Sequence, residues 1–220
     1  MKLYFSPLAC SLATRIALYE AGADATFVQV DGKTRTTAEG ANYLDVNSLG
    51  LVPALELAPG DVLTENAAIL QLVAARFPEA RLAPEGERER ARLQQWLSFI
   101  STELHKGLFM PLLDKSAPEG AGTYSLQKAA PRLAKLEAHL AGREFLLDAF
   151  SVADGYLFTV LNWAAVTPVA LDAWPAVRAY HARLAQRPSI ARAFAEERAL
   201  YVKELAARSE PARASAAAAS

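Results

Sequence analysis

The sequence predicts two units in one chain, an α/β unit followed by an all-helical unit. Runs typical of β-strands occur only before residue 65. Residues 77–86 then gather two prolines, a glycine and several charges, which is the composition of a linker. After that segment, apolar residues recur only at helical spacing. We therefore expect the units at 1–78 and 87–206, a linker at 79–86, and a disordered, low-complexity tail at 207–220.

Composition and charge narrow the class of protein. The chain has 220 residues, 52% of them hydrophobic, and a formal net charge of -1, so it can bury a sizeable core. It has no basic run of the kind that binds nucleic acid, and its longest uncharged run, 155–171, is short for a membrane span and contains Pro168. A single cysteine and the lack of a basic and apolar leader indicate a cytoplasmic protein. We expect no nucleic-acid partner and no membrane partner.

The first unit begins with a strand, a turn and a helix. Residues 2–5 form an apolar run, residues 6–9 a turn, and residues 11–21 a helix that stops at Gly22. The alternating run at 25–30 completes a strand–helix–strand unit, which indicates two parallel strands joined by a right-handed crossover.

The rest of this unit reads as a hairpin followed by a helix. Residues 52–57 and 62–64 are the two strands, and residues 66–77 are the helix. Pro53 stands at the start of the first strand, where it cannot donate to a ladder. A cis bond between Val52 and Pro53 would point the backbone of Val52 outward, toward an incoming chain.

Beyond the linker, helical spacing predicts a long helix at 87–106, with Ser98, Thr102 and His105 on a polar stripe beside its buried face. A second helix is expected at 125–141. Ser151 and Asp154 have the spacing of a capping box and open the uncharged helix. Pro175 and Pro188 suit the first turns of the last two helices.

Cys10, the only cysteine, lies where the first helix begins. The positive end of a helix dipole favours a thiolate there, although a lone cysteine is more often a small buried apolar residue. Ala13 stands where the second cysteine of a Cys-x-x-Cys pair would be, so any thiol chemistry uses one thiol. The sequence has no metal-ligand cluster and no glycine-rich phosphate loop, and we expect no metal and no cofactor.

Three features of the first unit converge at the ends of its elements. They are Cys10, the extended backbone at Val52, and the pair Glu65 and Asn66 at the N-terminus of a helix. Binding sites of open sheets form where such ends meet. Together these residues suit a small peptide with a thiol, an extended middle and an α-amino acid head.

These residues resemble the glutathione transferases, and within them the bacterial beta class, from Met1 to about Tyr201. The resemblance rests on the motifs Lys2-Leu-Tyr, Cys10-Ser-Leu12, Val52-Pro53-Ala-Leu55, Leu63-Thr-Glu65, Glu103-Leu-His-Lys-Gly107, Ser151-Val-Ala-Asp-Gly-Tyr-Leu-Phe158 and Ala185-Gln-Arg-Pro188. It implies a thioredoxin-like N-terminal domain followed by an all-helical C-terminal domain, in a homodimer. It also implies that glutathione is a co-substrate whose thiolate attacks a small hydrophobic electrophile.

The resemblance implies two catalytic residues. Cys10 would face the sulfur of glutathione, as a hydrogen-bond donor to its thiolate or as the partner in a mixed disulfide. His105 would reach the sulfur from the helical domain. His105, Phe109, Met110 and Trp163 are candidate walls of the electrophile pocket, and core packing is the alternative for the last three.

It also implies the glutathione-binding residues. Val52 would pair its backbone with the cysteinyl part, Glu65 and Asn66 would hold the γ-glutamyl head, and Lys106 and Arg35 would face the glycyl carboxylate. Two further binding residues are expected on the long helix: Ser98, where relatives carry an asparagine, and Glu103. Asn66 itself replaces the family's frequent serine or glycine.

Two other functions stay open. Exchange of Cys10 with glutathione disulfides would make the chain a thiol transferase or disulfide reductase. A noncatalytic glutathione-binding protein on the same fold is the other, since fold does not fix function.

Overall fold

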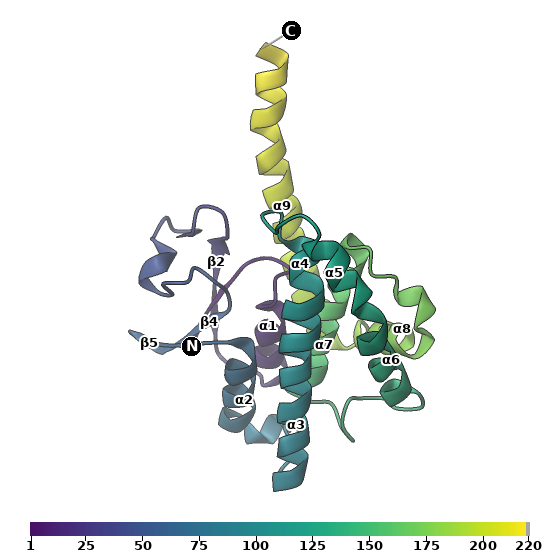
Figure 1. Cartoon of the computed structure of the whole chain (residues 1–220). Coiled ribbons are helices and arrows are strands. Elements are labelled where there is room, and N and C mark those ends of the chain that lie inside the picture. The colour runs from purple at the N-terminus through teal and green to yellow at the C-terminus, as the bar shows by residue number, and fades with distance from the viewer. Residues whose placement is uncertain (219–220) are drawn as a thin grey trace.

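The computed structural model of the chain describes the backbone of residues 1–218 and the surroundings of the side chains of residues 1–207. A unit with a sheet and an all-helical unit lie side by side (Figure 1). This is the predicted fold class, a thioredoxin-like domain followed by a helical domain. The first unit contains β1 (Lys2–Phe5), α1 (Leu12–Glu20), β2 (Thr26–Asp31), β3 (Thr36–Thr37), the 3₁₀ helix η1 (Tyr43–Asp45), β4 (Ala54–Ala58), β5 (Asp61–Thr64) and α2 (Asn66–Arg76).

The sheet confirms the predicted strand–helix–strand unit and hairpin. Its strand order is β3-β2-β1-β4-β5, with β1 and β2 parallel and β1, β4 and β5 successively antiparallel. Alternation along β1 directs its side chains to opposite faces. Leu3 and Phe5 join the main core on the side of the helices, whereas Tyr4 joins a smaller cluster with Val30 and Tyr43 on the other face.

Helix α1 ends as its sequence predicts. Gly22 has a positive φ of 60°, a conformation that glycine adopts without steric cost. Its N–H donates to the carbonyl of Tyr19, and the N–H of Ala23 donates to the carbonyl of Leu18. These two bonds form a Schellman motif and satisfy carbonyls that the helix end would otherwise leave unpaired.

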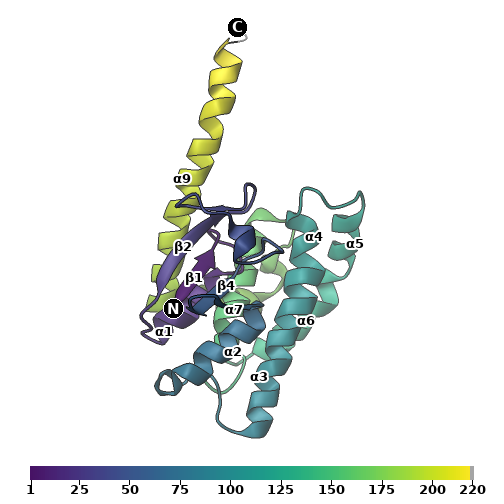
Figure 2. The same cartoon turned by 90° about the vertical axis from the view of Figure 1, so that its left-hand side faces the viewer.

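The helical unit packs against α1 and α2 and includes a long continuous helix over residues 87–113 (Figures 1 and 2). Its elements are η2 (Pro78–Ala80), α3 (Glu87–Phe99), the π-helix η3 (Ile100–Phe109), α4 (Met110–Leu113), α5 (Ala121–Gln127), α6 (Ala129–Leu140), α7 (Val152–Leu161), η4 (Asn162–Val166), η5 (Leu171–Ala173), α8 (Pro175–Leu184) and α9 (Pro188–Ala218). The capping box predicted at Ser151 and Asp154 is present at the start of α7.

Two helices differ from the sequence-based expectation. The helix predicted at 87–106 continues to Leu113, and its middle is π-helical. The helix predicted at 125–141 is divided at Lys128 into α5 and α6. Pro131 accounts for that division, because proline has no N–H to donate and its ring clashes with the carbonyl four residues earlier.

The tail also differs from the expected disorder. The backbone of α9 stays helical to Ala218, and both views show this helix projecting beyond the rest of the molecule (Figures 1 and 2). Its last residues are rich in alanine, the residue with the highest helix propensity. Among the described residues, no helix is both long enough and apolar enough to cross a membrane.

Candidate functional site

A cleft of about 580 Å³ lies between the two units. The turn after β1, the segment before β4 and the start of α2 line it from the first unit, and η3, α7, η4 and α9 line it from the second. It brings together six of the nine residues that the sequence predicts for the site. These six are Cys10, Val52, Glu65, Asn66, His105 and Lys106.

Cys10 lies in the turn that precedes α1 and is half-buried. Its Sγ donates to the carbonyl oxygen of Val52 over 3.1 Å. Burial raises the pKa of the thiol to about 12, although Lys106 and the backbone N–H groups of Cys10 and Ser11 act in the opposite direction. The thiol is therefore protonated at neutral pH and available as a hydrogen-bond donor. The start of α1 does not make Cys10 a thiolate, because desolvation outweighs the favourable N–H groups.

The segment before β4 contains a cis peptide bond between Val52 and Pro53, so the condition under which the Val52 backbone is expected to point outward is met. The carbonyl of Leu51, just before it, accepts hydrogen bonds from the hydroxyl of Tyr43 at 2.8 Å and from Nδ2 of Asn47 at 2.7 Å. These bonds fix the extended backbone beside Cys10. That backbone is what a bound chain would pair with.

Glu65 and Asn66 open α2 but have different surroundings. Glu65 is exposed at the cleft and has a φ of 67°, a strained conformation for a residue other than glycine. Asn66 is buried, and its Nδ2 donates to the carbonyl of Cys10 at 2.7 Å while its Oδ1 accepts from the hydroxyl of Thr14 at 2.8 Å. The Asn66 side chain therefore joins the starts of α1 and α2, and Glu65 is the side chain that faces solvent.

The π-helix η3 supplies His105 and Lys106. π-Helical turns are rare and occur frequently at functional sites. Nδ1 of His105 lies 2.8 Å from the hydroxyl of Tyr156, and its ring centroid lies 4.9 Å from that of Trp163. Burial, with the charge of Lys106, lowers the pKa of His105 to about 4. His105 is therefore a neutral imidazole at neutral pH.

Gly107 makes this π-helical turn sterically feasible. A Cβ at Gly107 would lie 2.7 Å from the backbone oxygen of Thr102, five residues earlier. We expect Gly107→Ala to lower the free energy of unfolding by about 1–3 kcal/mol and to move His105 and Lys106. Denaturant unfolding should therefore show a lower midpoint, and the affinity for glutathione should fall as well. Gly122→Ala, whose Cβ would meet a side chain at an ordinary 3.4 Å, is the control. An unchanged Gly107→Ala protein would show that the turn tolerates a side chain.

The lowered pKa of His105 predicts a pH effect on stability. The unfolded chain binds a proton at this histidine near pH 6.5, whereas the folded chain binds it only near pH 4. Stability is therefore lost as the pH falls through that window. Between about pH 7 and about pH 5, melting temperatures of wild type should fall further than those of His105→Gln. Equal falls in the two proteins would contradict the buried, neutral state of His105.

Three predicted residues lie outside the cleft lining. Ser98 is exposed on α3, Glu103 pairs with Arg132 at 2.5 Å, and Arg35 is exposed, with its side chain packed over Gly50. The π-helix explains the place of Ser98, because each π-helical residue turns less about the axis than an α-helical one. The polar stripe expected to join Ser98 to His105 is thereby rotated, and Ser101 lines the cleft instead.

Tyr156 is a site residue to which the sequence assigned no role. It is buried on α7, and its hydroxyl lies against Nδ1 of His105. Burial raises its pKa, while hydrogen bonds with Ser101 and Asn66 lower it. The signal in the sequence was a tyrosine within the uncharged run 155–171, which opens in a fully buried helix where a hydroxyl requires a partner.

The remaining cleft wall is largely apolar. Met110 and Trp163 line it as predicted, together with Leu113 and the exposed Val166. Phe109 does not line it, because its side chain is fully buried and contacts the ring of Trp163 edge-on at 5.9 Å. Core packing is therefore the role of Phe109.

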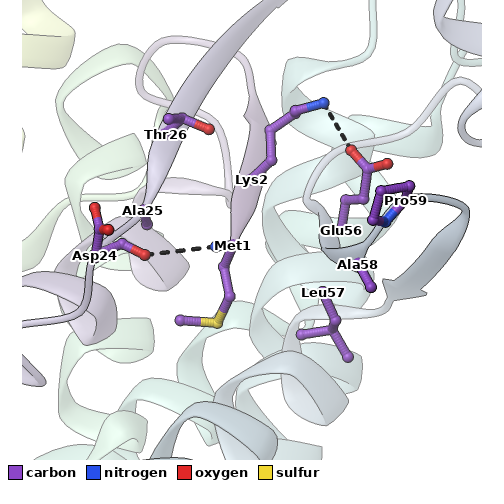
Figure 3. Close-up of a pocket in the computed structure, with 9 residues that line it drawn as sticks. All are labelled: Met1, Lys2, Asp24, Ala25, Thr26, Glu56, Leu57, Ala58 and Pro59. Carbon is purple, nitrogen blue, oxygen red and sulfur yellow. Dashed lines mark hydrogen bonds and ion pairs between the residues drawn. The ribbon is translucent and has the colours of Figure 1, made fainter.

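A second hollow, of about 290 Å³, lies where β1 and β4 meet the segment before β2 (Figure 3). Its walls include the ion pair between Lys2 and Glu56 at 2.8 Å. It contains none of the predicted site residues and is wide open to solvent. The cleft between the units is thus the candidate site.

Comparison with known proteins agrees with this geometry. Residues 1–75 match the family model of the glutathione S-transferase N-terminal domain, and residues 122–183 match that of the C-terminal domain. The chain is 38% identical to glutathione S-transferase GstA of Escherichia coli O157:H7, over 90% of this chain and 98% of that protein. It is 35% identical to glutathione S-transferase GST-4.5 of Xanthomonas campestris, over 84% of this chain and 92% of that protein.

Solved structures give the same result. The ternary complex of BphK, a bacterial glutathione S-transferase, is 45% identical, with a TM-score of 0.86 over 90% of this chain and 99% of that one. A sphingomonad glutathione S-transferase in complex with glutathione is also 45% identical, with a TM-score of 0.84 over 90% and 98% of the two chains. The beta-class enzyme of Sphingomonas chungbukensis is 44% identical, with a TM-score of 0.85 over 90% and 98%.

Proposed function

Because this chain belongs to the glutathione S-transferase family, we propose that it conjugates the thiolate of glutathione to small hydrophobic electrophiles, with Cys10 at the sulfur site. One observation carries this proposal. The cleft gathers a thiol, an extended backbone and a carboxylate from the first unit, and an imidazole and an ammonium from the second. That set matches the sulfur, the peptide middle and the charged ends of glutathione.

In this proposal each part of glutathione has a partner in the cleft. The carboxylate of Glu65 binds the α-ammonium group of the γ-glutamyl head, and the backbone of Val52 pairs with the cysteinyl part. Lys106 binds the glycyl carboxylate, and Arg35, at the rim, assists it. Asn66 contributes indirectly, because its side chain holds the starts of α1 and α2 together. Ser98 and Glu103 lie outside the cleft lining, so a contact of either with glutathione requires the ligand to extend beyond the cleft.

The chemistry requires a glutathione thiolate at neutral pH. A free thiol has a pKa near 8.5, and each unit of depression corresponds to about 1.4 kcal/mol of preferential stabilisation of the thiolate. Cys10 contributes an S–H donor, and neutral His105, whose Nδ1 is bonded to Tyr156, contributes Nε2. The thiolate attacks an electrophilic carbon, a carbon–sulfur bond forms, and a leaving group such as chloride departs with the bonding electrons.

Glutathione-dependent disulfide exchange through Cys10 is less well supported. Exchange requires a thiolate as the attacking group. Burial raises the pKa of Cys10 to about 12, which leaves few thiolates at neutral pH. A protonated Cys10 suits a donor that stabilises the thiolate of glutathione.

Binding and turnover of wild type test the proposal together. We expect calorimetry to show glutathione binding, and a chlorinated aromatic electrophile to be conjugated, with much slower reduction of a glutathione mixed disulfide. Binding without either turnover would instead identify a noncatalytic glutathione-binding protein. Reduction of the disulfide alone would identify a thiol transferase.

We also propose a homodimer in the cytoplasm. The family resemblance supports the dimer, and light scattering at working concentration should give twice the mass of the chain. The cytoplasm suits the reaction because its glutathione is kept reduced, as the thiol that the chemistry consumes.

A further inference from the structure

Glu197 is a buried carboxylate whose surroundings tie the C-terminal helix to the sulfur site. It lies on α9 and is fully buried. Its Oε2 accepts the backbone N–H of Leu8 at 2.8 Å, and its Oε1 lies 3.2 Å from Nε of Arg15. Leu8 is two residues before Cys10, so a side chain near the end of the sequence contacts the turn that carries the thiol.

The other backbone group of Leu8 is bound as well. Its carbonyl accepts Nε1 of Trp163 at 3.0 Å. Both polar groups of one residue of the first unit are thus held by side chains of the second unit. We call Leu8, Glu197 and Trp163 the Leu8 clamp.

Leu8 requires such a clamp because its backbone is strained. Its φ of 59° is left-handed, a region that leucine rarely adopts. Strain of this kind persists only when the surroundings over-determine it, and it concentrates at functional sites. The turn itself is closed internally by the bond from Ala9 N–H to the carbonyl of Ser6, so the clamp sets where the whole turn lies.

Burying this carboxylate carries a cost. Desolvation raises the pKa of Glu197 to about 8, although the charge of Arg15 and the N–H of Leu8 oppose that rise. Arg15 is itself buried, with its guanidinium 4.2 Å from the ring centroids of Phe5 and Phe27. Titratable groups whose pKa is strongly shifted by burial beside a specific charged partner concentrate at functional sites.

We propose that Glu197, acting through the Leu8 clamp, is a positioning residue that holds Cys10 at the glutathione sulfur. This inference rests on the proposed function of the cleft. Trp163 contributes a second link, because its ring contacts that of His105, so the clamp also connects the turn with the catalytic imidazole. Neither Glu197 nor the N–H of Leu8 needs to touch glutathione.

Two variants of Glu197 and one control separate positioning from general stability. Glu197→Ala removes the acceptor for the Leu8 N–H, whereas Glu197→Gln keeps an acceptor oxygen. The control, Glu20→Gln, weakens the same boundary between the units far from Cys10, because Glu20 of α1 binds Arg187 at 2.5 and 2.7 Å and also Ser189. We expect both Glu197→Ala and Glu20→Gln to lower the melting temperature.

Only the Glu197 change should affect the site. We expect Glu197→Ala to lower kcat roughly tenfold to a hundredfold, with a smaller change in the KM for glutathione, because misplacing the turn disturbs the reacting geometry. Glu197→Gln should recover most of the lost kcat, and Glu20→Gln should keep the kcat of wild type. Equal kcat losses in Glu197→Ala and Glu20→Gln would reduce Glu197 to a structural role and overturn the proposal.

Alkylation of Cys10 tests positioning without any turnover. Cys10 is the only cysteine, so its reaction with iodoacetamide reports one site. We expect Glu197→Ala to react faster than wild type, roughly tenfold for each unit by which the pKa of Cys10 falls, and Glu20→Gln to react like wild type.

This assay is independent of the proposed transferase function. If wild type conjugates nothing, the transferase function fails, while the alkylation rates still show whether Glu197 holds Cys10 in place. If Glu197→Ala does not fold, Trp163→Phe, which removes the donor to Leu8, replaces it. Unchanged alkylation in the variant that folds would overturn the proposal.

Discussion

Replacing Asp154 by alanine is expected to lower the free energy of unfolding by about 3–5 kcal/mol, the largest stability effect we predict. The carboxylate is fully buried and accepts four hydrogen bonds, from the backbone N–H groups of Leu146 and Ser151 and from the hydroxyls of Ser151 and Tyr180, at 2.7–2.9 Å. Alanine would leave all four donors buried without a partner, and unpaired buried donors are costly.

Denaturant unfolding of Asp154→Ala, beside Ser151→Ala, measures this effect. Ser151→Ala removes only one of the four donors, so its loss should be about 1 kcal/mol. Asp154 lies outside the cleft lining, and the fraction of Asp154→Ala that folds should retain glutathione affinity. Similar, small losses in the two variants would contradict a network centred on the carboxylate.

Replacing Glu65 by alanine is expected to weaken glutathione binding by about ten- to a hundredfold, the largest effect we predict on binding. The reason is the loss of a charge-assisted hydrogen bond to the γ-glutamyl ammonium group, which alanine cannot replace. Calorimetry gives the dissociation constant directly. Glu79→Ala, an exposed acid of η2 outside the cleft lining, is the matched control and should bind like wild type.

The backbone of Glu65 allows a sharper version of this experiment. Its φ of 67° strains alanine as it strains glutamate, whereas glycine adopts it without cost. Glu65→Gly should therefore be more stable than Glu65→Ala, while both lose affinity equally. Such a result would show that the strain is retained for binding. Affinity close to that of wild type in either variant would refute the proposed site for the γ-glutamyl head.

Local sequence patterns predicted much of the fold because each depends on neighbouring residues. Gly22 ended α1, and the spacing of Ser151 and Asp154 gave the capping box. Pro53 marked the start of a strand, but the pattern alone left open whether its peptide bond is cis. The position of Cys10 before α1 was also predictable from sequence. Its protonation state was not, because desolvation depends on what the fold packs around the thiol.

Features set by tertiary contacts escaped prediction. The π-helix η3 follows the usual apolar spacing of an α-helix, so nothing in the pattern separated Ser98 from the cleft or brought Ser101 into it. The partnership of Tyr156 with His105 spans 51 residues, and that of Glu197 with Leu8 spans 189. Sequence periodicity contains no information about which distant side chain a buried polar group meets.

The most direct test of glutathione conjugation at Cys10 is turnover of wild type and Cys10→Ala in parallel, with a chlorinated aromatic electrophile and with a glutathione mixed disulfide. We predict that wild type conjugates the electrophile and that Cys10→Ala does so more slowly but measurably, because His105 and the start of α1 remain. Disulfide reduction in wild type, abolished in Cys10→Ala, together with no conjugation in either protein, would contradict this account and identify Cys10 as an exchanging thiolate.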